Sequence, residues 1–130
     1  MERRLLQIIV CAGSLVPLVA GLVGLVLGPA GLGANQTPPI DFDSHFRYLS
    51  GLLLALGCGF LSTVPHIERH RGRFIFLTLI VFTGGTGRLL GIALIGVPSW
   101  PSFSALVLEL LVAPALALWA SRLAAVKQRN

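Results

Sequence analysis

Four apolar stretches, each long enough to cross a lipid bilayer, dominate the pattern of hydrophobic and polar positions along this chain. They cover about residues 5–27, 46–65, 74–97 and 103–121. The hydrocarbon core of a bilayer is about 30 Å thick, a distance that about 20 helical residues span. Because lipid offers no hydrogen-bond partners, a spanning segment must satisfy its backbone groups internally. The pattern therefore predicts an all-α integral membrane protein, a four-helix bundle that forms a single membrane domain over residues 1–130.

Composition agrees with this prediction and removes one alternative. Hydrophobic residues make up 55% and charged residues 12% of the 130 positions, whereas a soluble domain is about 25% charged. The formal net charge of +5 would suggest nucleic acid as the partner of a soluble protein. Here the basic residues lie at the ends of the predicted spans, where membrane topology accounts for them. We therefore expect membrane lipids as partners and no nucleic acid.

The distribution of Lys and Arg predicts how the chain is inserted. If the N-terminus is cytoplasmic, eight of the ten basic residues lie on the inner side, Arg47 lies outside and Arg88 lies within a span. Cytoplasmic loops carry such an excess of Lys and Arg. Both termini of this multi-pass protein are therefore predicted to be cytoplasmic, with the inner arginines near anionic lipid headgroups. The eight inner residues are Arg3, Arg4, Arg69, Arg71, Arg73, Arg122, Lys127 and Arg129.

Small residues predict where the spans pack against one another. Gly, Ala or Ser at every third or fourth position lets two helices approach closely, and each span contains such a stripe. The stripes favour a compact bundle and leave open whether the same faces also form a homo-oligomer. They are Gly24 and Gly28; Gly51, Ala55 and Gly59; Gly84, Gly87 and Gly91, beside Arg88; and Ala113, Ala117 and Ser121.

Two charged residues, Arg88 and Glu109, lie inside the third and fourth spans. A charged side chain near the bilayer centre costs about 2.5–3.5 kcal/mol on insertion scales. The helical rise places Glu109 roughly 9 Å and Arg88 roughly 13 Å below the outer ends of their spans. We therefore predict a salt bridge between them, while Asp41 or Asp43 stays open as the partner of Arg88. Pro114 removes a backbone donor close to Glu109 and predicts a bend there.

The start of the second span adds polar residues at the same outer side. Asp41, His45 and Tyr48 fall on one side of a helix that begins early enough, and Asp43 or Ser44 would make a suitable N-cap. We predict one ligand-binding site in the outer half of the bundle, on which five residues converge: Asp41, His45, Tyr48, Arg88 and Glu109. Beside Arg88, Glu109 would act as an anchor or base, and His45 and Asp41 would handle protons.

The chemistry of this group of residues stays open at this point. A purely structural lock, a ligand-binding or catalytic pocket, and a short proton or ion path all agree with ionisable residues inside a membrane. The sequence assigns no catalytic residue and no cofactor, and it leaves open whether the protein is an enzyme. His66 and His70, with Glu68 between them, lack a convincing third ligand, so no metal site is predicted.

Three segments resemble those of a known bacterial family. They are Asp43-Ser-His-Phe-Arg-Tyr-Leu-Ser-Gly51, Gly87-Arg-Leu-Leu-Gly91 and Leu108-Glu-Leu-Leu-Val-Ala-Pro114. The chain resembles, over nearly its whole length, the small four-span membrane proteins of domain of unknown function 4345. The resemblance implies a bacterial inner (cytoplasmic) membrane and a four-helix bundle, and it implies no activity. The chain is more loosely similar, in architecture alone, to small sterol isomerases and terpenoid cyclases.

Two functional hypotheses follow. The first is an inner-membrane protein that binds a lipid-like or isoprenoid-like molecule in an outward-side polar pocket. The second is a small accessory or structural subunit that packs against a larger membrane protein complex, with its glycine faces as protein contacts.

Overall fold

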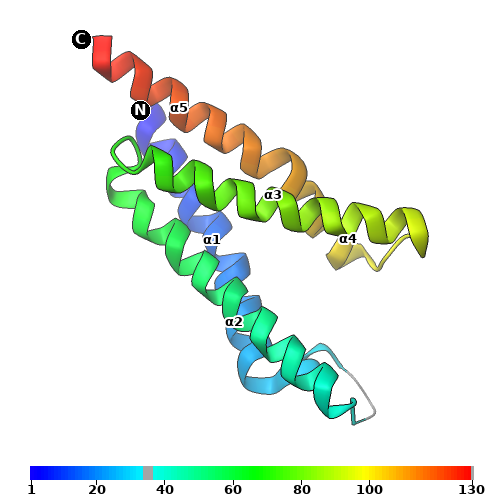
Figure 1. Cartoon of the computed structure of the whole chain (residues 1–130). Helices are drawn as coiled ribbons and strands as arrows, with labels where there is room; N and C mark the ends of the chain where they lie inside the picture. The colour runs from blue at the N-terminus through cyan, green and yellow to red at the C-terminus, as the bar shows by residue number, and fades with distance from the viewer. Residues whose placement is uncertain (34–36, 130) are drawn as a thin grey trace. The chain divides into compact units, whose positions relative to one another are not determined.

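Helices are the only regular secondary structure in the part of the chain that the structure describes. The computed structural model describes residues 1–33 and 37–129, and these contain no strand. Three long helices are α1 (Glu2–Leu27), α2 (Ile40–Thr63) and α3 (Arg71–Leu94) (Figure 1). Three further elements together form a fourth long helix, and two more are short 3₁₀ turns. They are α4 (Trp100–Val107), the π-helical segment η3 (Leu108–Val112), α5 (Ala113–Arg129), η1 (Gly28–Leu32) and η2 (Val64–His66).

Among residues 1–33 and 37–129, four helices are long and apolar enough to cross a membrane. They are Glu2–Gly31, Ile40–His66, Arg71–Leu94 and Trp100–Ala125. The fourth runs without interruption through α4, η3 and α5 (Figure 1). The predicted all-α class with four membrane-length helices is therefore confirmed.

Prolines and one glycine explain where the helix ends differ from the prediction. α2 begins at Ile40 instead of residue 46, directly after Pro39, which occupies the N-cap position. The predicted caps were therefore wrong: Asp43 lies inside the helix, in a first turn where a carboxylate interacts favourably with the helix dipole. α3 ends at Leu94 instead of residue 97, because Gly96 adopts a φ of 130° that ends the helix.

The chain forms two compact units. One comprises residues 8–64 and is called here the α1–α2 unit. The other comprises residues 1–7 and 65–130 and is called the α3–α5 unit. Each is described separately.

The α1–α2 unit is held together by glycines that bring two helix backbones into contact. A Cβ on Gly21 would lie 2.5 Å from the backbone nitrogen of Leu54 and 2.8 Å from the carbonyl oxygen of Ser50. Gly24 lies against the Ser50 side chain. A Cβ on Gly57 of α2 would lie 2.7 Å from Leu18 Cγ. Only hydrogen fits at these positions, so the glycines set the close approach of α1 and α2.

The sequence identified this contact surface correctly on α1 and wrongly on α2. Gly24 is buried against α2, as its GxxxG spacing predicted. On α2, however, a Cβ on Gly51 would make only an ordinary contact with Leu25, at 3.7 Å, and Ala55 is exposed. The contact surface runs through Gly57 instead, because α2 is rotated relative to the predicted stripe.

The α3–α5 unit packs α3 along the fourth long helix. The buried positions of α3 are Phe74, Thr78 and Gly85, a spacing of four and seven residues that marks one helix face. The facing helix contributes small side chains. The buried apolar residues of that helix are Leu106, Ala117, Ala120 and Ala124.

Gly85 makes the closest approach in this unit. A Cβ there would lie 2.7 Å from Leu110 Cδ2 and 3.0 Å from Glu109 Cβ. In contrast, a Cβ on Gly84, Gly87 or Gly91 would meet no described atom within 4 Å. The predicted stripe on α3 was therefore one residue out of register. The predicted stripe of the fourth helix was partly right, since Ala117 is buried.

Candidate functional site

Arg88 and Glu109 form an ion pair where α3 meets the π-helical segment. Arg88 Nε lies 3.0 Å from Glu109 Oε2 and donates a hydrogen bond to Oε1 at 3.2 Å. This confirms the salt bridge that similar depth in adjacent spans predicted. Arg88 follows Gly85 by three residues on α3, so the pair lies at the edge of the helix–helix contact that Gly85 creates.

The carboxylate stands on a local change in helix geometry. Leu108–Val112 is a π-helical turn, and the N–H of Ala113 donates to the carbonyl of Leu108, five residues earlier. Pro114 follows directly and has no N–H to donate to Leu110, so the regular hydrogen-bond ladder is broken at this point. Short π-helical turns are frequent at functional sites. The bend predicted next to Glu109 takes this form.

The pair leaves part of its hydrogen-bonding capacity unused. Among the residues that the structure describes, Arg88 donates only through Nε, although its guanidinium carries further N–H groups. The Arg88 side chain is 46% exposed and that of Glu109 is 20% exposed. Glu109 Oε2 is buried and accepts no hydrogen bond from the described residues. The guanidinium is therefore held at one nitrogen, and its other N–H groups have no partner among the described residues.

A second Arg–carboxylate pair, in the α1–α2 unit, is fully engaged. Arg47 Nε donates to Asp43 Oδ2 at 2.8 Å, and Nη2 donates to Oδ1 at 3.3 Å. Arg47 Nη1 donates to the backbone carbonyls of Leu25 and Val26, at 2.9 and 2.8 Å. These carbonyls belong to the last turn of α1, where they have no partner within the helix. Arg47 therefore caps α1 and ties it to α2.

Asp43 and Arg47 thus resolve one alternative that the sequence left open. Asp43 is the partner of Arg47, and Glu109 is the partner of Arg88. Both residues contact the interface between α1 and α2, through their bond to each other and the bonds of Arg47 to α1.

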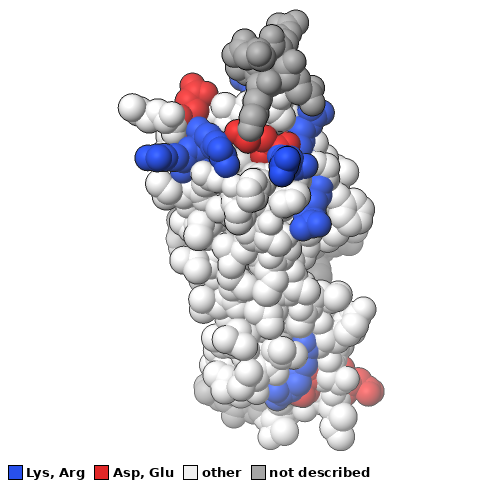
Figure 2. All heavy atoms as spheres, turned by 90° about the vertical axis from the view of Figure 1, so that its left-hand side faces the viewer, with Lys and Arg blue, Asp and Glu red and all other residues white. Residues whose placement is uncertain are grey.

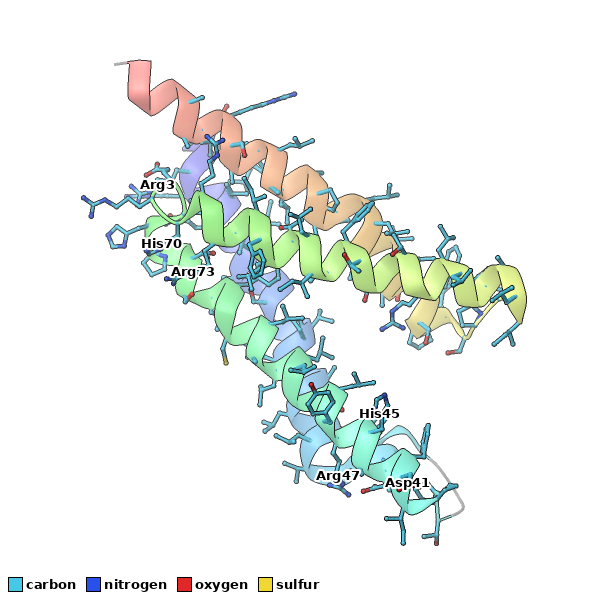
Figure 3. All side chains as sticks on the ribbon, in the orientation of Figure 1. Arg3, Asp41, His45, Arg47, His70 and Arg73 are labelled. Carbon is cyan, nitrogen blue, oxygen red and sulfur yellow. The ribbon has the colours of Figure 1, made fainter. Side chains whose placement is uncertain are left out.

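The remaining predicted site residues lie on another face of α2. The side of α2 that faces α1 carries Asp43 and Arg47. A residue two positions away lies about 160° around the helix, on the side that faces away from α1. That outer side carries Asp41 and His45, with Tyr48 next to them, and all three are exposed. The rings of His45 and Tyr48 are 6.4 Å apart between centroids. Figure 3 shows Asp41 and His45 on the first turns of α2.

Arg88 and Glu109 belong to the α3–α5 unit, and Asp41, His45 and Tyr48 belong to the α1–α2 unit. The structure brings the first two together. The convergence of all five on one ligand site stays a prediction.

The inner loop places two histidines side by side. The rings of His66 and His70 are 6.2 Å apart and meet edge to face. Within the described part of the chain, no three His, Cys, Asp or Glu side chains are grouped so that they could hold a metal ion.

Sequence reasoning missed two residues of these sites. Gly85 was passed over in favour of Gly84, although its spacing of three from Arg88 places both on the same helix face. The capping role of Arg47 had no sequence signal, because its partners are backbone carbonyls 21 and 22 residues away.

The comparisons with known proteins give one result. The model of a family described as Domain of unknown function (DUF4345) matches residues 5–120. No curated protein and no solved structure matches the chain.

Proposed function

Because the chain belongs to the family described as Domain of unknown function (DUF4345), whose description assigns no activity, we propose a function from its own site. The protein binds an amphipathic, lipid-like or isoprenoid-like molecule, and Arg88 holds the polar end of that molecule. One observation carries this proposal: within a helix long enough to span a membrane, the Arg88 side chain is 46% exposed and donates to the described residues through a single nitrogen.

The energetics of a membrane favour an occupant at this position. Donors inside a bilayer that lack partners cost several kcal/mol, by the same argument that applies to backbone groups. Glu109 fixes Nε and so orients the plane of the guanidinium, and the other N–H groups remain available to a second acceptor. An anionic or strongly polar oxygen group fits them, because the guanidinium fork matches carboxylate and phosphate geometry.

The surroundings suit a ligand with an apolar tail. Leu89 and Leu90, the two residues that follow Arg88, are 49% and 60% exposed. Arg88 precedes the end of α3 at Leu94 by six residues, or about 9 Å of helix. That distance lets a polar headgroup at the membrane surface reach the guanidinium while its tail stays in the hydrocarbon region.

The proposal includes an orientation. We place both termini in the cytoplasm of a bacterial inner membrane, since this puts the basic residues of the chain on the inner side. Arg88 then serves the outer leaflet. Asp41, His45 and Tyr48, which lie near the start of α2, belong to the outer side in this orientation, and their part in the ligand site stays a prediction.

Native mass spectrometry of gently extracted protein tests the proposal. We expect the wild-type protein to retain a small molecule at unit stoichiometry, and Arg88→Gln and Glu109→Gln to lose it at least tenfold while remaining folded. Thr86→Ala is the matched control, because Thr86 lies on the same exposed part of α3 and its hydroxyl donates only to the carbonyl of Thr83. Retention of the molecule by both variants would contradict the proposal.

A second candidate function rests on a different observation. Gly84, Gly87 and Gly91 form a small-residue stripe on α3 with open space above it, and such stripes pack transmembrane helices. A partner helix from a larger complex would fit there. In that case the protein copurifies with larger proteins at a fixed ratio, carries no small ligand, and loses those partners when Gly87 is replaced by Leu.

A further inference from the structure

A group of exposed arginines marks one end of the α3–α5 unit. Arg4, Arg69 and Arg71 are all exposed, and together they are called the basic surface. Figure 2 shows several Lys and Arg side chains gathered with a few Asp or Glu side chains, next to an area without charged residues. Figure 3 shows Arg3, His70 and Arg73 at that end of the unit. This group is separate in sequence from the Arg88–Glu109 pair.

The N-terminal segment is fastened to the loop that carries this surface. Arg3 Nη2 donates to the carbonyl of Pro65 at 3.0 Å, and Gln7 Nε2 donates to the same oxygen at 3.3 Å. Arg3 Nε lies 3.5 Å from Glu68 Oε1. Leu6 and Ile67 are completely buried beneath these contacts. The two segments therefore form one ordered platform.

The platform holds together the segments that carry the three arginines and pairs one nearby acid, Glu68. Arg4 follows Arg3 and Arg69 follows Glu68, so the Arg3–Glu68 contact joins the segment of Arg4 to that of Arg69. Arg71 begins α3 two residues later. Glu68 has a side chain only 14% exposed and is engaged by Arg3, so its charge is already balanced. Glu2 is also exposed, but the three arginines outnumber it, so the surface keeps a net positive charge.

The position of the surface in the chain indicates its partner. One helix that can span a membrane begins at Glu2, one ends at His66 and one begins at Arg71. The three arginines therefore lie where membrane spans begin and end, at the level of lipid headgroups. Nine of the ten basic residues in the chain are Arg, and the guanidinium fork binds phosphate oxygens in a bidentate manner that Lys cannot match.

We propose that the basic surface binds the phosphate groups of anionic phospholipids in the adjoining leaflet. The occupant is a lipid headgroup, because the area next to the basic surface is the apolar surface of the spanning helices. A phospholipid covers both areas at once, with its phosphate on the arginines and its acyl chains on the helices. A soluble anion would cover only the arginines. This binding is independent of the ligand proposed for Arg88, since the two sites share no residue.

Native mass spectrometry in a defined lipid mixture tests this inference. The protein is extracted into detergent with equal amounts of phosphatidylglycerol and phosphatidylcholine of the same acyl chains. We expect the wild-type protein to retain phosphatidylglycerol at least fivefold over phosphatidylcholine. The triple variant Arg4→Gln, Arg69→Gln, Arg71→Gln is expected to retain the two lipids equally.

A second variant separates a local surface from net charge. Thr37→Glu, Ser44→Glu and Ser99→Glu together also lower the net charge by three, at exposed positions outside the two segments that carry the basic surface. This variant is expected to keep the preference for phosphatidylglycerol. Equal loss in both triple variants would overturn the proposal, since it would reduce the effect to overall charge.

Thermal unfolding in phosphatidylcholine checks folding and the source of the phosphate. Both triple variants are expected to unfold within a few degrees of the wild type without anionic lipid. Phosphatidylglycerol is expected to raise the unfolding temperature of the wild type, and inorganic phosphate at 5 mM is not. Equal stabilisation by inorganic phosphate, or no preference in the wild type, would overturn a lipid-headgroup site.

Discussion

Two arginine–carboxylate pairs within the long helices, Asp43–Arg47 in the α1–α2 unit and Arg88–Glu109 in the α3–α5 unit, are built for different purposes. Arg47 uses all of its nitrogens: two bind Asp43 and the third binds two carbonyls at the end of α1. Arg88 binds Glu109 through Nε alone among the described residues. The side chains of Arg47 and Arg88 are similarly exposed, at 38% and 46%. Exposure therefore does not distinguish them, whereas the use of their donors does.

The helix contacts beside the two pairs differ in the same way. Gly21 of the α1–α2 unit meets the backbone of Leu54, which cannot move without the whole helix. Gly85 of the α3–α5 unit meets the end of the flexible Leu110 side chain. One contact surface is rigid and has its polar groups satisfied. The other is adaptable and retains unused donors, which is the combination expected of a binding site.

The largest expected effect comes from Gly21→Ala. Its Cβ would approach the Leu54 nitrogen to 2.5 Å, so α1 and α2 must separate, and we expect a loss of about 3 kcal/mol in the free energy of unfolding. Thermal or denaturant unfolding in mild detergent measures this. Gly13→Ala on the same helix is the control, since its Cβ meets nothing within 4 Å. A stability equal to that of Gly13→Ala would show that the backbones are not in contact.

Replacement of the two arginines sharpens the comparison directly. Arg47→Ala removes the hydrogen bonds to Leu25 and Val26 and leaves Asp43 without its partner, for an expected loss of about 2 kcal/mol. Arg88→Ala removes one hydrogen bond and also leaves its carboxylate, Glu109, unpaired, but no backbone carbonyl loses a donor, so the expected loss is smaller, about 1 kcal/mol. Unfolding in the same detergent gives both values. If Arg88→Ala proves as destabilising as Arg47→Ala, the Arg88–Glu109 pair is a structural lock.

The sequence was sufficient to predict where the long helices lie in the chain, but not which face of each helix packs against its neighbour. The apolar runs are as long as a bilayer is thick, so the four long helices could be predicted without any knowledge of tertiary contacts. Which face packs inward depends on the partner helix, and one residue turns a helix by about 100°. The choice of Gly84 over Gly85, and of Gly51 over Gly57, failed for this reason.

The site was predictable only where the membrane limits the alternatives. Arg88 and Glu109 are charged residues at similar depth in neighbouring spans, so few other partners were available to either. Asp43 and Arg47 lie near a helix end, where backbone carbonyls and water compete as partners. The π-helical turn at Glu109 was foreseen only as a bend, because a proline indicates a disrupted hydrogen-bond ladder and does not specify its replacement.

A smaller effect is expected from Gly85→Ala. The new methyl group would lie 2.7 Å from Leu110 Cδ2, a side-chain end that can rotate away, so we expect a loss of about 1 kcal/mol. The same methyl lies 3.0 Å from Glu109 Cβ, so ligand retention in native mass spectrometry should fall together with stability. Gly84→Ala is the adjacent control. Unchanged retention would show that the approach of α3 to Glu109 does not shape the site.

Pro114→Ala is expected to have the smallest effect on stability and a specific effect on the pair. Alanine supplies an N–H that can bond to Leu110, so the π-helical turn can relax toward regular α-helix and rotate Glu109 away from Arg88. We expect a stability change within about 0.5 kcal/mol, since a restored backbone bond offsets the lost ion pair. A double-mutant cycle of Arg88→Ala and Glu109→Ala measures the coupling of the pair, which is expected to decrease when residue 114 is Ala. Unchanged coupling would show that the contact with Gly85 maintains the π-helical turn. Pro114 would then be tolerated by the turn and would not be its cause.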